Sequence, residues 1–284
     1  MTAVHDLVVD DAVIVTMNAR RDVVHGWIAV DDGAVTAVGS GRAPTARERV
    51  DARGGIVHPG FLSTHQHAMD ALGRGARDEA PDFFDWLFGT YYGTVLGYGG
   101  ADAGRAVALT GADLARAGIT TVVDCWGVGG VGSRRADACL VASVAAAVRT
   151  GLRWIVAPMV SDRLPPGWDA LLDHHAVEPA DLVAPTDVAR RFADAACDLA
   201  TGRVAVWTSV ELPEMASDAL LAGLGDLADL NTGVDHLSRM IAFLFTRVLV
   251  SLGFNSTVEI DLPLSNTSKP VTGITWIRND LFHD

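Results

Sequence analysis

Residues 6–57 alternate short apolar runs with turn signals. The runs DLVVDDAVIVTM and GWIAVDDGAVTAVG, which begin at Asp6 and Gly26, are rich in valine and isoleucine. Such runs are typical of β-strands, and the Asp31-Asp32-Gly33 step inside the second run is typical of a hairpin turn. The pattern predicts a small antiparallel, β-sandwich-like domain over residues 1–57.

From Ile56 onward the pattern changes to strand-like runs that alternate with alanine-rich stretches of helical period. This alternation predicts βαβ units around a parallel sheet, and therefore the α/β class. Strands are expected near 56–64, 119–125, 153–159 and 203–208, and helices near 101–117, 135–150, 185–200 and 216–229. The aromatic-rich segment 78–100 lies between the first strand and the first helix, where barrel proteins place the mouth of the active site.

The composition changes near residue 229. Residues 1–228 contain no lysine and one asparagine, Asn18, whereas residues 229–284 contain Lys269, four asparagines and a single alanine. A complete eight-unit barrel needs roughly 250 residues, so the segment 58–228 has room for about half of one. We therefore expect a partial, incomplete TIM-type barrel over 58–228. The compositionally distinct tail 229–284 would be frameshifted or unrelated, and a natural tail specific to this lineage is the alternative.

Two histidines, His65 and His67, stand on either side of one glutamine where the apolar strand that begins at Pro59 ends. Alternate side chains of a strand share a face, so both imidazoles point the same way. Two converging imidazoles are suitable first ligands for zinc or iron. The His-x-His pattern is common by chance, and its place at the end of an apolar strand is what makes it informative.

This region resembles the first barrel strand of the amidohydrolase superfamily, in its hydrolytic deaminase and chlorohydrolase branch (cytosine deaminase-like, ATZ/TRZ). The resemblance covers about residues 5 to 228, the N-terminal half of such a protein. It implies a (β/α)8 barrel, one divalent metal (Zn or Fe) and hydrolysis of a non-peptide C–N bond in a small N-heterocyclic substrate. The matching motifs are His58-Pro59-Gly60-Phe61, Thr64-His65-Gln66-His67, Leu72-Gly73-Arg74-Gly75 and, for the second strand, Ala117-Gly118-Ile119-Thr120-Thr121-Val122-Val123-Asp124.

The resemblance also implies a set of ligands. In this branch the metal is held by the first-strand pair, which matches His65 and His67, by a fifth-strand histidine and by an eighth-strand aspartate. His236 is the candidate for the third ligand, although it comes one residue early and Arg239 stands where the family has its catalytic glutamate. A histidine at the surface is an equally good interpretation of His236. No catalytic residue can be assigned, and the absence of lysine from 203–210 favours the mononuclear type.

Three residues near predicted strand ends are candidates for a substrate pocket: Arg74, Trp126 and Glu211. Trp126 could stack on a heterocycle or belong to the core, and Arg74 could orient a substrate or close its loop. Other residues at strand ends are Asp124, Cys125, Asp162 and Glu214, of which Cys125 is expected to be a buried small hydrophobe. The pair His174-His175 is expected to be exposed in a polar connection.

The formal charge of −13 argues against nucleic acid and anionic membranes as partners. Three scattered cysteines indicate neither a disulfide framework nor a cysteine-rich zinc site. The N-terminal residues lack the pattern of a signal peptide, and the most apolar tail segment carries Arg247, so neither predicts a membrane span. We expect a cytoplasmic protein and leave a homo-oligomer open.

Two functions remain in competition. The first is a metal-dependent hydrolase that deaminates a small N-heterocycle with a metal-activated water. The second is a catalytically inactive, truncated amidohydrolase fragment, because two protein ligands alone rarely hold catalytic zinc.

Overall fold

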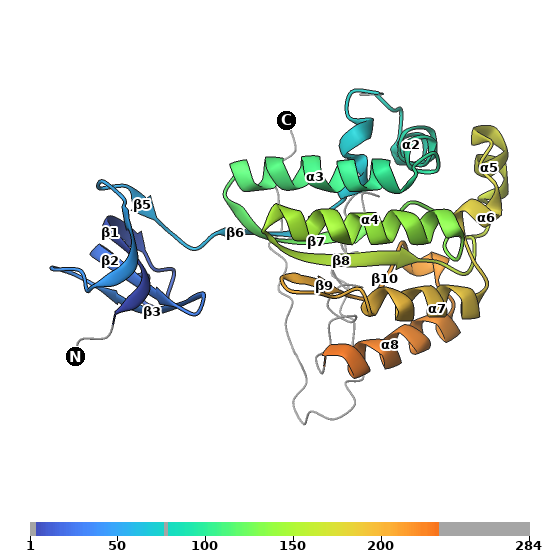
Figure 1. Ribbon diagram of the computed structural model, residues 1–284. Coiled ribbons are helices and arrows are strands. Elements are labelled where there is room, and N and C mark those ends of the chain that lie inside the picture. Colours follow the sequence, from blue (N-terminus) through green and yellow to red (C-terminus); the bar gives the residue numbers. More distant parts are fainter. Residues whose placement is uncertain (1–3, 77–78, 233–284) are drawn as a thin grey trace. The chain divides into compact units, whose positions relative to one another are not determined.

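The computed structural model describes residues 4–76 and 79–232, which form two compact units that divide between Phe61 and Leu62. Each unit contains one five-stranded sheet in its described residues (Figure 1). The strands of the first unit are β1 (His5–Val15), β2 (Val23–Asp31), β3 (Ala34–Gly39), β4 (Ala46–Asp51) and β5 (Ile56–Val57).

The first sheet is mixed rather than antiparallel, so the expected direction of its last strands was wrong. The strand order is β3-β2-β1-β4, and β5 also pairs with β1. The pairs β1–β2 and β2–β3 are antiparallel, while β4 and β5 both run parallel to β1. After the two hairpins the chain crosses to the open side of β1 instead of turning back beside β3, and a crossover of this kind yields a parallel pair.

The predicted hairpin turn is present between β2 and β3. Asp31 pairs with Ala34 across it, and the two residues between them, Asp32 and Gly33, have φ angles of 50° and 74°. Two consecutive positive φ angles match the twist of a two-residue hairpin, which explains the Asp-Gly sequence.

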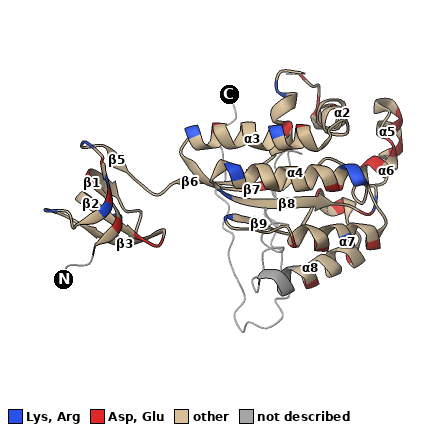
Figure 2. Cartoon of the chain, in the orientation of Figure 1, with Lys and Arg blue, Asp and Glu red and all other residues tan. Residues whose placement is uncertain are grey.

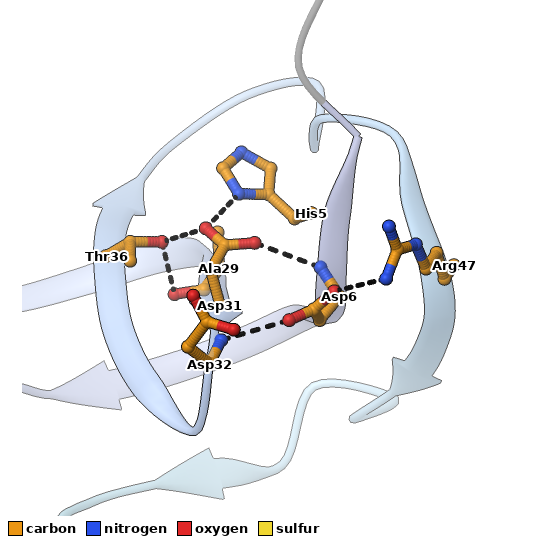
Figure 3. A network of polar contacts seen from close by, with 7 residues as sticks. All are labelled: His5, Asp6, Ala29, Asp31, Asp32, Thr36 and Arg47. Carbon is orange, nitrogen blue, oxygen red and sulfur yellow. Dashed lines mark hydrogen bonds and ion pairs between the residues drawn. The ribbon is translucent and has the colours of Figure 1, made fainter.

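A polar network around Asp31 ties this turn to the start of β1 (Figure 3). The Asp31 carboxylate lies 2.8 Å from His5 Nδ1 and accepts hydrogen bonds from Thr36 Oγ1 (2.7 Å) and from the backbone N–H of Asp6 (3.0 Å). These contacts, led by His5, lower the pKa of Asp31 to about 2. Asp6 in turn accepts a hydrogen bond from Arg47 on β4 (2.9 Å), so one polar network joins four strands.

The second unit contains the strands expected from the sequence, but the first of them, expected at 56–64, is divided: residues 56–57 form β5 in the first sheet, and β6 begins at Phe61. The central strand β8 pairs in parallel with β7 on one side and with β9 and β10 on the other, and β6 is the neighbour of β7. Since β9 and β10 follow one another along the same strand, the sheet has four positions. The bounds are β6 (Phe61–Gln66), β7 (Ile119–Trp126), β8 (Arg153–Val160), β9 (Val204–Val206) and β10 (Ser209–Val210).

Four long helices run alongside these strands (Figure 1). Their order confirms the βα alternation, and their bounds lie within a few residues of the expected ones. They are α3 (Gly100–Arg116), α4 (Arg134–Thr150), α7 (Thr186–Cys197) and α8 (Asp218–Thr232). The short elements are η1 (Ala68–Gly73), α1 (Phe83–Trp86), η2 (Leu87–Tyr92), α2 (Gly93–Val95), α5 (Asp169–His175), α6 (Pro179–Leu182) and η3 (Pro213–Met215). Most of the predicted tail 229–284 lies outside the described residues.

The core of the second unit lies between the strands and the long helices. Its largest fully buried side chains include Trp126, Trp154, Phe88 and Tyr92. Phe88 and Tyr92 come from the aromatic-rich segment, which is folded into short helices and packed into the core rather than left as an open loop. Among the described helices, none has the length and apolar character needed to cross a membrane.

Candidate metal centre

The rings of His65, near the end of β6, and of His67, directly after it, face each other. Their ring centroids are 4.7 Å apart and their planes are nearly perpendicular, at 81°. His65 and Gln66 end β6, and His67 directly follows it. The alternation of a strand brings the first and third residues of this triplet to one side, so the rings converge as the sequence predicted.

Cys125, the next-to-last residue of β7, contacts both imidazole rings. Its carbonyl oxygen is 3.0 Å from Nδ1 of His67, and its Sγ is 3.5 Å from Nδ1 of His65. An imidazole that donates from Nδ1 to a carbonyl has its lone pair at Nε2, and metal-bound histidines are commonly fixed in this way. Burial raises the pKa of the Cys125 thiol to about 12, so this residue remains a thiol at neutral pH. The pair therefore fits the first two ligands of a divalent metal ion, with Cys125 as support.

Asp124 anchors the backbone next to the histidines. Its side chain is completely buried and accepts hydrogen bonds from the Ala68 backbone N–H (2.9 Å) and from Trp154 Nε1 (3.2 Å). Burial raises the pKa of Asp124 to about 7, in opposition to these two hydrogen bonds. Because Ala68 directly follows His67, this carboxyl group ties the end of β6 to β7 and β8. From the sequence Asp124 was only one of several residues at strand ends, and no local signal identified this role.

A tyrosine pair connects the histidines to Glu211. The Tyr91 ring packs edge-on against His67 at 6.3 Å, and the Tyr92 hydroxyl donates to Glu211 Oε1. Burial raises the pKa of Glu211 to about 7, and burial, followed by the negative charge of Glu211, raises the pKa of Tyr91. Glu211 follows β10, so His67, Cys125 and Glu211 all lie at carboxyl ends of strands, where barrel proteins carry their chemistry.

The two other predicted pocket residues have structural contacts. Trp126 is 1% exposed, donates from Nε1 to Ser143 Oγ (2.9 Å) and stacks on Phe192. Arg74 is exposed and forms an ion pair with Asp113 on α3, at 2.6 Å. Their predicted contacts with a substrate stay predictions, and the present contacts correspond to the core and loop-closing alternatives.

Asp162 and Glu214 are the other candidates at strand ends. Asp162 accepts hydrogen bonds from Thr186 Oγ1 and from Ser217, at 2.6–2.7 Å, and so joins the starts of α7 and α8. Glu214 is exposed. His236, the predicted third metal ligand, lies outside the described residues.

One expectation about histidines was wrong in part. His174 is exposed as predicted, but the side chain of His175 is only 9% exposed, because its ring stacks on Phe88. The sequence pattern gave no sign of this partner, which lies far away along the chain.

Several known proteins are similar to part of this chain, although no family model matches it. The 5'-deoxyadenosine deaminase of Methanosarcina barkeri is 29% identical over 122 residues, which are 43% of this chain and 28% of that protein. The 5-methylthioadenosine/S-adenosylhomocysteine deaminase of Nitratidesulfovibrio vulgaris strain Miyazaki F is 40% identical over 92 residues, or 31% of this chain and 21% of that protein. Over part of its length, the chain is related to the deaminase and chlorohydrolase branch of the amidohydrolase superfamily.

Solved structures of the same branch have a similar fold. Atrazine chlorohydrolase from Arthrobacter aurescens TC1, complexed with zinc, superposes with a TM-score of 0.64 at 18% identity, covering 84% of this chain and 58% of that one. Guanine deaminase from C. acetobutylicum gives a TM-score of 0.62 at 16% identity, covering 79% of this chain and 50% of that one. The chain thus spans about half of these structures and about a quarter of the curated relatives, and the likeness to the solved structures concerns the fold alone.

Proposed function

We propose that this protein is a metal-dependent hydrolase of non-peptide C–N bonds that deaminates a small N-heterocycle. The observation that carries the proposal is the convergence of His65 and His67 in front of Cys125, whose carbonyl oxygen accepts from Nδ1 of His67. This arrangement suits one divalent ion, zinc or iron. His236 remains our candidate for a further ligand.

Each described residue has a separate part in this proposal. His65 and His67 would hold the ion, which when bound lowers the pKa of a coordinated water toward neutrality. The carboxyl group of Glu211 has a pKa of about 7, so near neutral pH it can both hold and release a proton. The Tyr92 hydroxyl donates to Oε1 of Glu211, so in this proposal Oε2 is the oxygen that would exchange a proton with the heterocycle.

For the substrate we propose a 6-aminopurine nucleoside. Two observations support this choice: the curated relatives are named for 5'-deoxyadenosine, 5-methylthioadenosine and S-adenosylhomocysteine, and an aromatic pair lies beside His67. Trp86 and Tyr91 stack at 6.0 Å with an angle of 26° between their planes, and Tyr91 also contacts His67. Flat aromatic side chains favour flat heterocycles through stacking.

The test is ammonia release by the full chain loaded with zinc or with iron. The assay takes 5'-deoxyadenosine, 5-methylthioadenosine and S-adenosylhomocysteine as nucleosides, with guanine for comparison. We expect release from a nucleoside, and a rate at least roughly a thousandfold lower for His67→Ala, because the metal supplies the activated water. The matched control is His58→Ala, since His58 is an exposed histidine that precedes β6.

Two outcomes would count against the proposal: no release from any of these substrates with either metal, or equal rates for the wild type and His67→Ala. If the chain is instead an inactive fragment, the predicted alternative, we expect no ammonia release and less than one equivalent of tightly bound metal per chain.

A further inference from the structure

A second group of potential metal ligands lies apart from the β6 histidines. Asp85 is part of α1, and His174 and His175 are the last two residues of α5. In the described part of the chain, this is the one group of three histidine, cysteine or acidic side chains whose ligand atoms all lie within 4.8 Å of one another. The sequence brings two of these residues together, and the fold adds the third.

The spacing between Asp85 and His175 is that of two ligands rather than of a hydrogen bond. His175 Nε2 and Asp85 Oδ1 are 3.5 Å apart. Hydrogen bonds from N–H to O usually measure about 2.7–3.2 Å. Two donor atoms that each lie about 2.1 Å from a tetrahedral ion are separated by about 3.4 Å. The observed distance therefore leaves room for an ion between the two side chains.

Packing holds His175 in this position before any ion binds. Its ring is stacked on Phe88 at 5.7 Å with an angle of 18°, and Phe88 in turn contacts Trp168 edge-on at 5.3 Å. The exposed His174, whose ring centroid is 4.7 Å from that of His175, has a ligand atom within 4.8 Å of those of the other two residues. An exposed side chain can change its rotamer to complete the coordination.

The electrostatic surroundings favour a cation. Segment 169–175 contains Asp169 and Asp173 and no lysine or arginine, and α5 carries acidic residues, drawn in red (Figure 2). The histidines also lie at the carboxyl end of the helix, where the backbone carbonyls carry partial negative charge.

We propose that Asp85, His174 and His175 form a second metal site, which binds a transition metal ion such as Zn²⁺ or Co²⁺. Two imidazoles and one carboxylate select such ions over Mg²⁺ and Ca²⁺, which prefer oxygen ligands. Three protein ligands leave one coordination position for water. This site is independent of the proposed deaminase activity.

The bound ion clamps two connections together. α1 belongs to the segment after β6, and α5 belongs to the segment after β8. The segment after β6 continues through η2 to Tyr91 and Tyr92, which contact His67 and Glu211. An ion at α5 therefore restrains the segment that carries these two tyrosines.

The experiment is equilibrium dialysis of the full chain against Co²⁺, with the visible absorption of the bound ion as a second readout. We expect His174→Ala to lose one equivalent and the corresponding part of the absorption, and Asp85→Asn to do the same. His58→Ala, which changes another exposed histidine, should lose nothing. Excess Mg²⁺ should not displace the ion. Because His174 is exposed, its substitution leaves the packing of the fold intact.

The His67→Ala variant distinguishes the second metal site from the proposed deaminase function. In the His67→Ala variant, the equivalent that depends on His174 should still bind. The second site is refuted if His174→Ala binds as much Co²⁺ as the wild type, or if His67→Ala abolishes the same equivalent. If the wild-type chain releases no ammonia from any of the substrates but still binds the His174-dependent ion, the proposed function alone is refuted.

Discussion

The two histidine pairs have nearly the same ring geometry and very different support. The centroids are 4.7 Å apart in both pairs, with angles of 81° for His65 and His67 and 83° for His174 and His175. In the strand pair, Nδ1 of His67 is held by the Cys125 carbonyl on β7. In the helix pair, the ring of His175 stacks on Phe88 and His174 is exposed. Ring spacing alone therefore does not identify a metal site: the strand pair is supported by a contact at Nδ1 of His67, and the helix pair by the nearby Asp85 carboxylate.

The largest predicted effect comes from removing the charge behind the strand pair. In Asp124→Asn, an amide N–H₂ would face either the Ala68 N–H or the Trp154 N–H, and a buried donor would lose its acceptor. We expect the free energy of unfolding to fall by about 3 kcal/mol. Urea denaturation measures this change, and Co²⁺ binding at α5 should be preserved in the folded variant.

The control is Asp113→Asn, which breaks the exposed ion pair with Arg74. We expect the control to lose less than about 1 kcal/mol. A loss in Asp124→Asn that is no larger than that of the control would mean that burial of Asp124 does not support the strand pair.

The next effect depends on pH and is confined to the strand site. Glu211 has a folded-state pKa of about 7 against an ordinary value of 4.5, so its ionisation opposes folding. The contribution of Glu211 to the free energy of unfolding is most favourable below pH 4.5 and decreases as the pH rises to about 7. Above that pH the protein bears the full cost of keeping an ionised carboxylate buried. Glu211→Gln keeps an acceptor for Tyr92 and removes the cost, so it should stabilise the protein by about 3 kcal/mol at pH 8.5 and by little at pH 4.

Chemical denaturation at several pH values measures this difference. Glu214→Gln is the matched control, because it changes an exposed glutamate on the same connection and should show no such dependence. A stabilisation by Glu211→Gln that is equal at both ends of the pH range would refute the link between burial and ionisation.

A smaller effect sharpens the role of Cys125. Cys125→Ala removes the sulfur next to His65 but keeps the carbonyl that accepts from His67. We expect the affinity of the strand site for Zn²⁺ to fall about tenfold, since supporting contacts typically contribute 10–100-fold. Competition with a chelator measures the affinity, and an unchanged value would mean that the sulfur does not orient His65.

The smallest effect concerns Arg74, which lies on the surface. A double-mutant cycle of Arg74→Ala and Asp113→Ala should give a coupling energy of about 0.5 kcal/mol, the usual size for an exposed ion pair. Ammonia release by Arg74→Ala should equal that of the wild type if this residue only closes its loop. A strongly raised KM would support the predicted contact with the substrate instead.

The sequence predicted those features that depend on local pattern. Apolar runs and alanine-rich stretches located the strands and long helices of the second unit to within a few residues, and the strand period placed His65 and His67 on one face. The Asp32-Gly33 turn was equally readable, because few residues adopt two positive φ angles in succession.

Features that depend on distant partners were not predictable. The parallel direction of β4 and β5 results from a crossover that leaves no residue signature. The burial of His175 depends on Phe88, and the role of Asp124 depends on Trp154, each brought close only by the folded chain. The parts of the site that require three strands at once therefore became visible only in three dimensions.

Anomalous diffraction at the zinc absorption edge, on crystals of the full chain grown with zinc, tests the account most directly. We predict one peak within about 2.1 Å of an imidazole nitrogen of both His65 and His67, and a second, weaker peak among Asp85, His174 and His175. Density at neither place, or a peak at α5 with none at the end of β6, would contradict the assignment of the β6 histidines as the metal centre.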